Sequence, residues 1–353
     1  MRNRRTDNTA HLLSHASAGE SASVTAFTTA QSRAYGYGRG ALRGTSVRRE
    51  LRGVYLPAWV DRSLASRVEA ARRVLPANVR PDGVTALHLL GVSVGDDETL
   101  RFVSAHPHQV RRPGVRVRRS ALALPAEMGE PEAAFASAAR ELDLVDLVAA
   151  GDWLVRLELT TPEQLVRSAA AVRGPGTARA RRAAALVRRR VDSVQESRLR
   201  LALVLAGLPE PEVNPTVRAR GRLVGRVDLL LGRWRVVIEY EGDQHRVDRR
   251  QWNRDVLRQE LLVTDGHSLV RVTAERMRSP RAVVLGVHQA LVEHGYDGPA
   301  PVFGPEWRSL FATARQRTRH AEHEVRERAA ASRDRPAVTA TPSGRPRDRR
   351  ARP

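Results

Sequence analysis

The sequence predicts an α/β (α+β) protein in which a small helical domain with a β-ribbon precedes an α/β sandwich with a mixed sheet. Residues 176–298 read as helix–β–β–β–helix–β–helix, an order that covers a mixed sheet with helices. Two short helical segments and an alternating ribbon come earlier, within residues 27–57. With 353 residues, 41% of them apolar, the chain is long enough for two compact domains and tails.

Composition sets the expected boundaries. Residues 1–24 are poor in bulky apolar groups, which predicts a disordered leader. The first domain is expected over 25–175, because "RGPG" at Arg173 marks a break, and the second over 176–298. Residues 299–353 are expected to begin as a helical segment and to end as a disordered basic tail.

The first domain begins with helix signals. Thr28 or Thr29 can cap a helix over 30–34, a second short helix can include Ala41 and Leu42, and "VRRELRGVYL" alternates as a hairpin does. Helix, turn, helix and ribbon together follow the plan of a winged helix-turn-helix. Further on, "GVTALHLLGV" predicts a helix, "GVRVRRSALAL" a strand, and 132–150 one long helix.

Arginines gather on this presumed recognition helix and wing, which favours DNA contact. The alternative is a small domain that only packs against its neighbour. The candidate DNA-binding residues are Arg33, Arg39, Arg43 and Arg48, with Arg49 beside them.

The second domain opens with the basic helix "TARARRAAALVRRR". Ser193 can cap the next helix, with Glu196 in its first turn and Gly207 as its end. The remaining elements are expected as strands near 213–217, 221–231 and 235–241, a charged helix over 249–262, the strand "SLVRVT", and a last helix over 280–294.

The charge balance indicates a polyanionic partner. Net charge is +21, and all 60 basic residues are arginine. Codon usage in a GC-rich genome can explain the missing lysines, but not the excess of base over acid, which favours DNA. We expect no membrane association, because no basic amphipathic helix has a bulky apolar face and no apolar run approaches ~20 residues.

Two further absences narrow the class of protein. The chain has no cysteine, which excludes disulfides and thiolate zinc sites. No signal peptide is recognisable at its start, so we expect a cytoplasmic protein.

Carboxylates gather along one predicted hairpin. A turn centred between Arg233 and Trp234 places Asp228 opposite Glu239, and alternation puts Glu239 and Glu241 on one face. Like charges so close in an apolar surround repel each other unless a cation lies between them. Oxygen-only clusters of this kind suit Mg²⁺ or Mn²⁺.

A second interpretation of the hairpin is a solvated edge whose acids pair with Arg226, Arg233 and Arg235. Glu196 favours the metal site, because its helix is expected to pack against the same sheet. His245, just beyond the hairpin, is placed to accept a proton or to shuttle one.

The helix acid Glu196, "GRVDLLL", "VVIEYEGDQH", "RRQWNRDVLRQ" and "DGHSLVRVT" together resemble the DUF 559 group. That group belongs to the PD-(D/E)xK restriction-endonuclease-like superfamily and is similar to very-short-patch-repair (Vsr) mismatch endonucleases. The resemblance covers 192–294 and implies a restriction-endonuclease-like α/β sandwich. "FTTAQSRAYG" and "ELRGVYLP" resemble the N-terminal winged-helix domain of AbiEi-type antitoxins.

The resemblance implies roles for individual residues. Asp228 matches the superfamily's metal-binding Asp, Glu239 its second acid, and Glu196 the acid on the first helix. Glu241 stands where the superfamily has Lys, and the chain has no lysine to replace it. The Vsr-like branch relies on histidine near this place, which His245 resembles.

Arg250, Arg254 and Arg258 recur every fourth residue and are expected to share one helix face. They can grip phosphates, or Asp255 and Glu260 can neutralise them.

These features together predict a metal-dependent DNA endonuclease with a DNA-binding N-terminal domain. The alternative is an antitoxin-type DNA-binding transcriptional regulator whose nuclease-like domain is inactive. A toxin partner and homo-oligomer formation are left open.

Overall fold

The computed structural model describes residues 26–105, 108–120, 129–241 and 249–311. The chain divides into two compact units, 1–301 and 302–353, each treated separately below. The leader predicted over 1–24 and the tail beyond Phe311 lie outside the described residues. Among the described residues, no helix combines the length and apolar character needed to span a bilayer.

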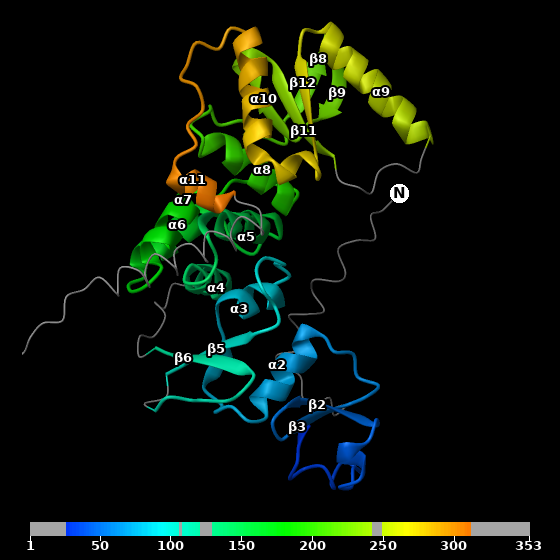
Figure 1. Ribbon diagram of the computed structural model, residues 1–353, viewed down its shortest axis with the longest axis vertical. Coiled ribbons are helices and arrows are strands. Elements are labelled where there is room, and N and C mark those ends of the chain that lie inside the picture. The colour runs from blue at the N-terminus through cyan, green and yellow to red at the C-terminus, as the bar shows by residue number, and fades with distance from the viewer. Residues whose placement is uncertain (1–25, 106–107, 121–128, 242–248, 312–353) are drawn as a thin grey trace, which may run out of the picture. The chain divides into compact units, whose positions relative to one another are not determined.

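The first element of the described residues is a small antiparallel sheet (Figure 1). It contains β1 (Phe27–Thr28), β2 (Val47–Leu51) and β3 (Val54–Pro57), in the order β1-β3-β2. The predicted hairpin is confirmed, since β2 pairs with β3 from Val47↔Pro57 to Leu51↔Val54. Helix α2 (Leu64–Arg72) follows and packs on both strands.

The helix predicted over 30–34 is wrong. Consecutive turns occupy 29–36, because Gln31 accepts a hydrogen bond from Thr28 N (3.0 Å) and Tyr37 N donates to Ser32 O (2.8 Å). The ring of Phe27 stacks on Tyr37 with centroids 4.8 Å apart, which fixes this loop on the sheet. The second predicted helix is one short 3-10 turn, η2 (Ala41–Arg43). The helix-turn-helix of a winged-helix domain is therefore not seen in residues 26–57.

A second three-stranded sheet follows. It contains β4 (Val79–Pro81), β5 (Leu100–Ser104) and β6 (Val115–Arg119), with β4 antiparallel and β6 parallel to β5. Helix α3 (Gly83–Leu89) and strand β6 lie where the sequence predicts them. One apolar cluster joins this sheet to the first through α2, with Leu56, Val68 and Phe102 buried in it.

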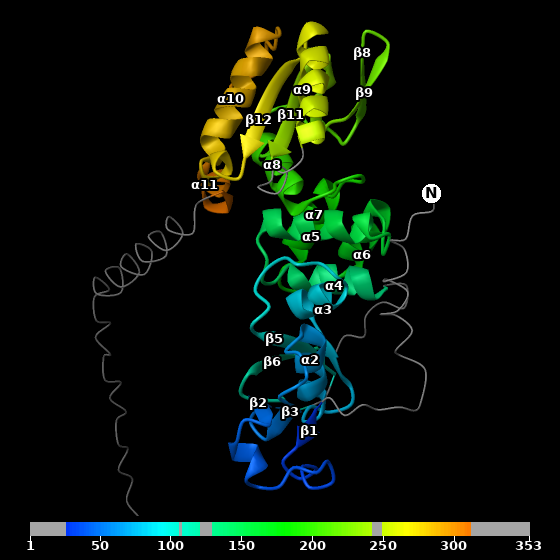
Figure 2. The ribbon, with the colours of Figure 1, turned by 90° about the vertical axis from the view of Figure 1, so that its right-hand side faces the viewer.

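A run of five helices follows along the chain, and Figure 2 labels each of them. They are α4 (Glu130–Ala138), α5 (Leu144–Arg156), α6 (Pro162–Ala171), α7 (Thr177–Leu186) and α8 (Val194–Val204). The single helix predicted over 132–150 is wrong, because the Asp143 side chain accepts from Asp146 N (2.9 Å) and starts a new helix. A Cβ at Gly151 would lie 2.5 Å from Val187, so glycine lets α5 and α7 approach closely.

The boundary expected between residues 175 and 176 falls inside this helical layer. Helices α6 and α7, on either side of it, pack against each other and against α5. The Arg198 guanidinium pairs with Asp146 at 2.7 Å, and Ser197 donates to Asp152 at 2.7 Å, so α8 is bonded to α5. The two-domain division there stays a prediction.

A four-stranded mixed sheet carries the predicted acidic hairpin. Its order is β12-β11-β10-β7, from β7 (Glu212–Val213), β10 (Leu229–Leu231), β11 (Val236–Glu241) and β12 (Ser268–Thr273). Strands β11 and β12 are parallel and the other pairs are antiparallel, which confirms the predicted mixed sheet. A 3-10 turn, η3 (Gly232–Trp234), connects β10 to β11, and the Trp234 ring packs edge-on against Tyr296.

Helices cover this sheet on both sides, as Figure 2 shows for α9 (Arg249–Thr264) and α10 (Pro280–Glu293). A short turn, η4 (Arg276–Arg278), precedes α10. The strand predicted over 221–231 is two strands: β9 (Arg222–Arg226) pairs with β8 (Thr216–Ala219) as a separate hairpin, and β10 joins the mixed sheet. The chain changes sheets at Val227 and Asp228.

The described part of the second unit is small. It holds α11 (Pro305–Leu310), whose Trp307 ring contacts Phe303 and Phe311 at centroid separations of 4.6 and 4.9 Å.

The helices and sheets described above confirm the coarse prediction of a mixed α/β chain.

Candidate active site

Asp228 lies at the junction between β9 and β10. The predicted register is confirmed over β10, where Leu229 pairs with Ile238, and continuing it by one residue sets Asp228 opposite Glu239. Tyr240 N donates to Asp228 Oδ2 at 2.7 Å, and Asn214 N donates to the Asp228 carbonyl at 2.8 Å. Two backbone donors therefore fix this aspartate.

Glu239 faces helix α9. Val237, two residues earlier on the same face of β11, packs with Leu262 of α9 in one apolar cluster. Two residues along a strand and four along a helix cover about the same 6–7 Å. The next contact is therefore Glu239 with Arg258, and their side chains form an ion pair of 2.6 Å. The Arg258 guanidinium also donates to the carbonyl of Arg226.

The charge of Asp228 is poorly compensated. Burial raises the pKa of the Asp228 carboxyl above its ordinary value, and the nearby Glu239 carboxylate raises it further. The hydrogen bond from Tyr240 and the charge of Arg258 act in the opposite direction without cancelling the rise. The ionised form of Asp228 is thus destabilised in this fold.

Glu196 is buried, with 8% of its surface exposed, in the first turn of α8. The Ser193 hydroxyl caps this helix as predicted, accepting from Glu196 N at 3.1 Å. Glu196 Oε2 accepts from Asp192 N (3.0 Å) and from Asn214 Nδ2 (2.7 Å). Burial raises the pKa of Glu196, and the charge of Asp228 also raises it, so the two carboxyls are electrostatic neighbours.

Asp228 and Glu239 are the pair of this site best suited to a divalent cation. Both are carboxylate oxygen donors, which Mg²⁺ and Mn²⁺ prefer, and a cation would relieve the unfavourable ionisation of Asp228. Within the described residues, however, no three acidic or histidine side chains are grouped to hold a metal. Glu196 Oε2 already accepts hydrogen bonds from Asp192 N and Asn214 Nδ2, and Arg258 neutralises the charge of Glu239.

Glu241 is separate from this group. Its side chain is 44% exposed and pairs with Arg271 of β12 at 3.2 Å. His245, the expected proton acceptor, lies outside the described residues.

The partners expected for a solvated hairpin edge are engaged elsewhere. Arg226 pairs with Asp192, Arg233 lies over the ring of Trp234, and Arg235 donates to the carbonyl of Asp265. Within the described part of the chain, the acids of the hairpin instead pair with Arg258 and Arg271.

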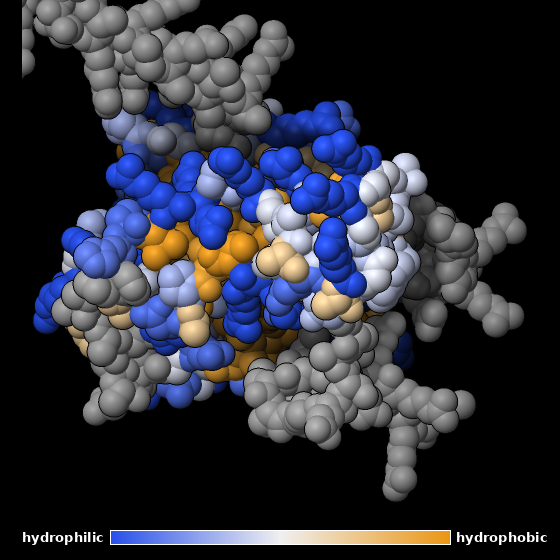
Figure 3. Space-filling view, turned by 90° about the horizontal axis from the view of Figure 1, so that it is seen from below, coloured by the Kyte–Doolittle hydropathy of each residue, from blue (hydrophilic) through white to orange (hydrophobic). Residues whose placement is uncertain are grey.

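The candidate DNA-binding arginines have different environments. Arg33, Arg39 and Arg43 are exposed on the turns that replace the predicted helices, whereas Arg48 donates to Val60 O at 2.9 Å. Figure 3 views the end that carries β2 and β3, where hydrophilic residues surround smaller hydrophobic areas. Arg250 and Arg254 lie on α9, and the structure does not describe their side chains.

Sequence reasoning missed Asn214 and the direction of Arg258. Asn214 connects Glu196 to the backbone of Asp228. The Asn-Pro dipeptide at Asn214 and Pro215 was the turn signal in the sequence, and the structure gives Asn214 a positive φ of 48°. Leu262, four residues after Arg258 on the same helix face, was the apolar signal that this face meets the sheet.

Comparison of this chain with protein-family models, with curated proteins and with solved structures finds no match.

Proposed function

We propose that the protein is a metal-dependent DNA endonuclease that hydrolyses phosphodiester bonds. The observation that supports this proposal is the electrostatic repulsion between the carboxyls of Asp228 and Glu239, whose backbones follow the register of β10 and β11, together with the effect of Asp228 on the buried Glu196. A fold gains no stability from an aspartate whose ionised form is disfavoured, so the arrangement favours binding of a cation. The resemblance to the DUF 559 group agrees with it.

Each residue of the site would have a different role in the proposed reaction. Asp228 and Glu239 would hold Mg²⁺ or Mn²⁺, which when bound supplies Lewis-acid polarisation of a phosphate oxygen. The Tyr240 amide keeps the Asp228 carboxylate oriented. Arg258, already beside Glu239, offers a guanidinium whose fork matches phosphate oxygens. His245 remains the expected proton acceptor.

DNA is the expected substrate because of charge. A chain with a net charge of +21 is attracted to a polyanion, and exposed Arg33, Arg39 and Arg43 can contact phosphates. Binding of this kind weakens as salt concentration rises.

Two observations favour the alternative of a DNA-binding regulator with an inactive nuclease-like domain. Arg258 compensates the charge of Glu239 as a cation would, and Glu241 stands where the superfamily has Lys. A site neutralised by its own arginine can bind DNA without cutting it.

Nicking of supercoiled plasmid separates the two functions. The full-length protein is incubated with plasmid in Mg²⁺, in Mn²⁺ or in EDTA. We expect nicked product with a divalent ion, none in EDTA, and none from Asp228→Asn, which keeps the side-chain volume but removes the charge.

Glu260→Gln is the matched control, because Glu260 is an exposed carboxylate of α9. It should cut at the wild-type rate. Wild-type protein that binds plasmid but never nicks it with either ion would instead establish the regulator.

A further inference from the structure

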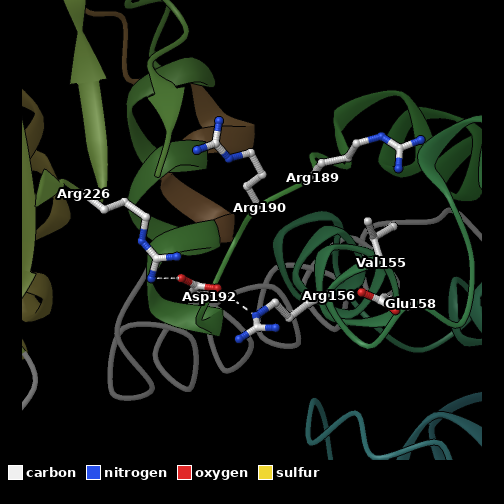
Figure 4. A pocket seen from close by; sticks show the side chains of 7 residues that line it. All are labelled: Val155, Arg156, Glu158, Arg189, Arg190, Asp192 and Arg226. Atoms are coloured by element: carbon white, nitrogen blue, oxygen red, sulfur yellow. Dashed lines mark ion pairs between the residues drawn. The ribbon is translucent and has the colours of Figure 1, made fainter. Parts of the chain in front are cut away.

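A cavity of about 360 Å³ lies between the C-terminal end of α5, the loop from α7 to α8 and the end of β9. Figure 4 shows its lining side chains, which are Val155, Arg156, Glu158, Arg189, Arg190, Asp192 and Arg226. Six of these seven are charged and four are arginine. The guanidinium groups among these lining residues can bind an anionic ligand.

One carboxylate holds two of the arginines. Asp192 pairs with Arg156 at 2.7 Å and with Arg226, as the dashed lines in Figure 4 show. Arg156 and Arg226 both remain more than half exposed. An anion entering the cavity would therefore find two accessible guanidinium groups already gathered at one point.

The loop that carries Arg190 is rigidly held. Arg190 has a φ of 68°, an uncommon conformation for a side chain of this size. Its guanidinium donates to Asn214 O at 2.8 Å, and Asn214 Nδ2 donates back to the Arg190 carbonyl at 2.7 Å. Among the described residues Arg190 forms no ion pair, so its charge is not neutralised by a carboxylate.

Two hydrogen-bonded paths connect the cavity to the candidate active site. Asp192 N and Asn214 both donate to Glu196. The carbonyl of Arg226 accepts from Arg258, which pairs with Glu239. Groups that line the cavity are thus bonded directly to residues of the acidic site.

We propose that this cavity binds a phosphate group of the DNA backbone next to the bond that is cut, with Asp192 holding its place in the free protein. Planar guanidinium groups bind phosphate oxygens in pairs, and a phosphodiester would take over the contacts of Asp192 with Arg156 and Arg226. The inference rests on the proposed function, because it assigns the cavity to the same nucleic acid.

Opposite changes at the two partners test the site. Asp192→Asn removes the competing charge and should tighten binding of a labelled DNA duplex, measured by fluorescence anisotropy in EDTA. Arg156→Gln removes one phosphate contact and should weaken binding about tenfold, with the salt dependence reduced by about 0.9 in log–log slope.

The matched control is Arg167→Gln, an exposed arginine of α6 outside the cavity. It should change affinity less than Arg156→Gln does. Arg156→Gln leaves Arg226 paired with Asp192, so the variant is expected to fold and to give the wild-type circular dichroism spectrum. Asp192→Asn and Arg156→Gln that bind DNA as Arg167→Gln does would overturn the proposal.

Inorganic phosphate distinguishes the source of the anion. It should compete with the duplex only weakly, because it offers one phosphate group. Calorimetry in which Asp192→Asn tightens binding of inorganic phosphate but not of DNA would overturn the assignment to nucleic acid. Because the binding assays contain EDTA, failure of plasmid nicking would refute the endonuclease, and with it the position of the site next to a cut bond, but would not affect the test of DNA-phosphate binding in the cavity.

Discussion

Two arginine–carboxylate clusters of this protein differ in how fully their charges are matched. In the first, Asp152 and Arg200 are 1% and 0% exposed, and Asp152 accepts from Arg188 N (2.7 Å), Ser197 (2.7 Å) and Arg200 (3.2 Å). Arg200 also donates to Glu210 and to Leu186 O. In the second, Asp228 has one described backbone donor to its carboxylate and a carboxylate neighbour.

We infer from this difference a structural role for the first cluster and a functional one for the second. Burial raises the pKa of Asp152 as it does that of Asp228, but Asp152 has three hydrogen-bond donors, one of them the Arg200 guanidinium, so removing it leaves those partners unsatisfied. A carboxylate beside a like charge is better neutral or bound to a cation. The first cluster fastens α8 to α5, whereas the second is the one whose chemistry is incomplete.

The largest expected effect is in the first cluster, around Asp152 and Arg200. Asp152→Ala leaves the fully buried Arg200 with Glu210 alone of its two carboxylate partners and should lower the free energy of unfolding by about 3–5 kcal/mol, measured by urea denaturation. The matched control is Asp146→Asn, since Asp146 pairs with the 40%-exposed Arg198 and should cost less than about 1 kcal/mol. Equal losses in the two variants would contradict the distinction drawn here.

The next effect concerns the second cluster, around Asp228 and Glu239, and the cation that we propose it binds. Mn²⁺ at about 100 times its dissociation constant should stabilise the folded protein by about 2.7 kcal/mol, seen as a rise in melting temperature. Asp228→Asn should abolish the rise and Glu260→Gln should keep it. Persistence of the rise in Asp228→Asn would place the ion elsewhere.

A smaller effect is expected from pH in metal-free buffer. The pKa of Asp228 is raised above the ordinary value of 3.8, so the folded protein binds this proton more tightly than the unfolded chain does. The resulting stabilisation is fully present below pH 3.8 and is lost as pH rises through the folded pKa. Burial is the largest cause of the raised pKa; among the charged neighbours, Glu239 raises it further, whereas Arg258 and Arg226 lower it.

Comparison with Asp228→Asn isolates the pH-dependent contribution of Asp228 to stability, because the amide does not titrate. Urea denaturation of both proteins should show that the unfolding free energy of wild type falls relative to that of Asp228→Asn as pH rises from 3 to 7. A difference that moves in favour of wild type would mean that the carboxylate is stabilised as an anion.

The sequence was sufficient for the second cluster's strands and insufficient for its surroundings. Alternation in 229–241 and one turn determine a register, so the opposition of Asp228 and Glu239 could be predicted. Arg258 could not be assigned to Glu239, because helix periodicity gives a face but not what that face meets. The break at Val227 depends on β8 and β9 forming their own hairpin, a tertiary choice.

The N-terminal errors have a different origin. Residues 29–36 have helix-compatible composition, yet local side-chain hydrogen bonds and the stacking of Phe27 on Tyr37 fix turns instead. Short segments without a strong apolar period are decided by such contacts, which a propensity argument does not include.

The smallest expected effect is at Glu241, and it tests whether the second cluster extends along β11 beyond Glu239. Its ion pair with Arg271 joins two side chains that are each at least 40% exposed, so solvent screens the attraction. Glu241→Gln should therefore change the free energy of unfolding by less than about 1 kcal/mol in urea denaturation. It should also leave the Mn²⁺-dependent rise in melting temperature intact, because only Asp228 and Glu239 are assigned to the cation. A variant that loses the rise would extend the cation site along β11 to Glu241 and would show that its pairing with Arg271 belongs to the metal-free state alone.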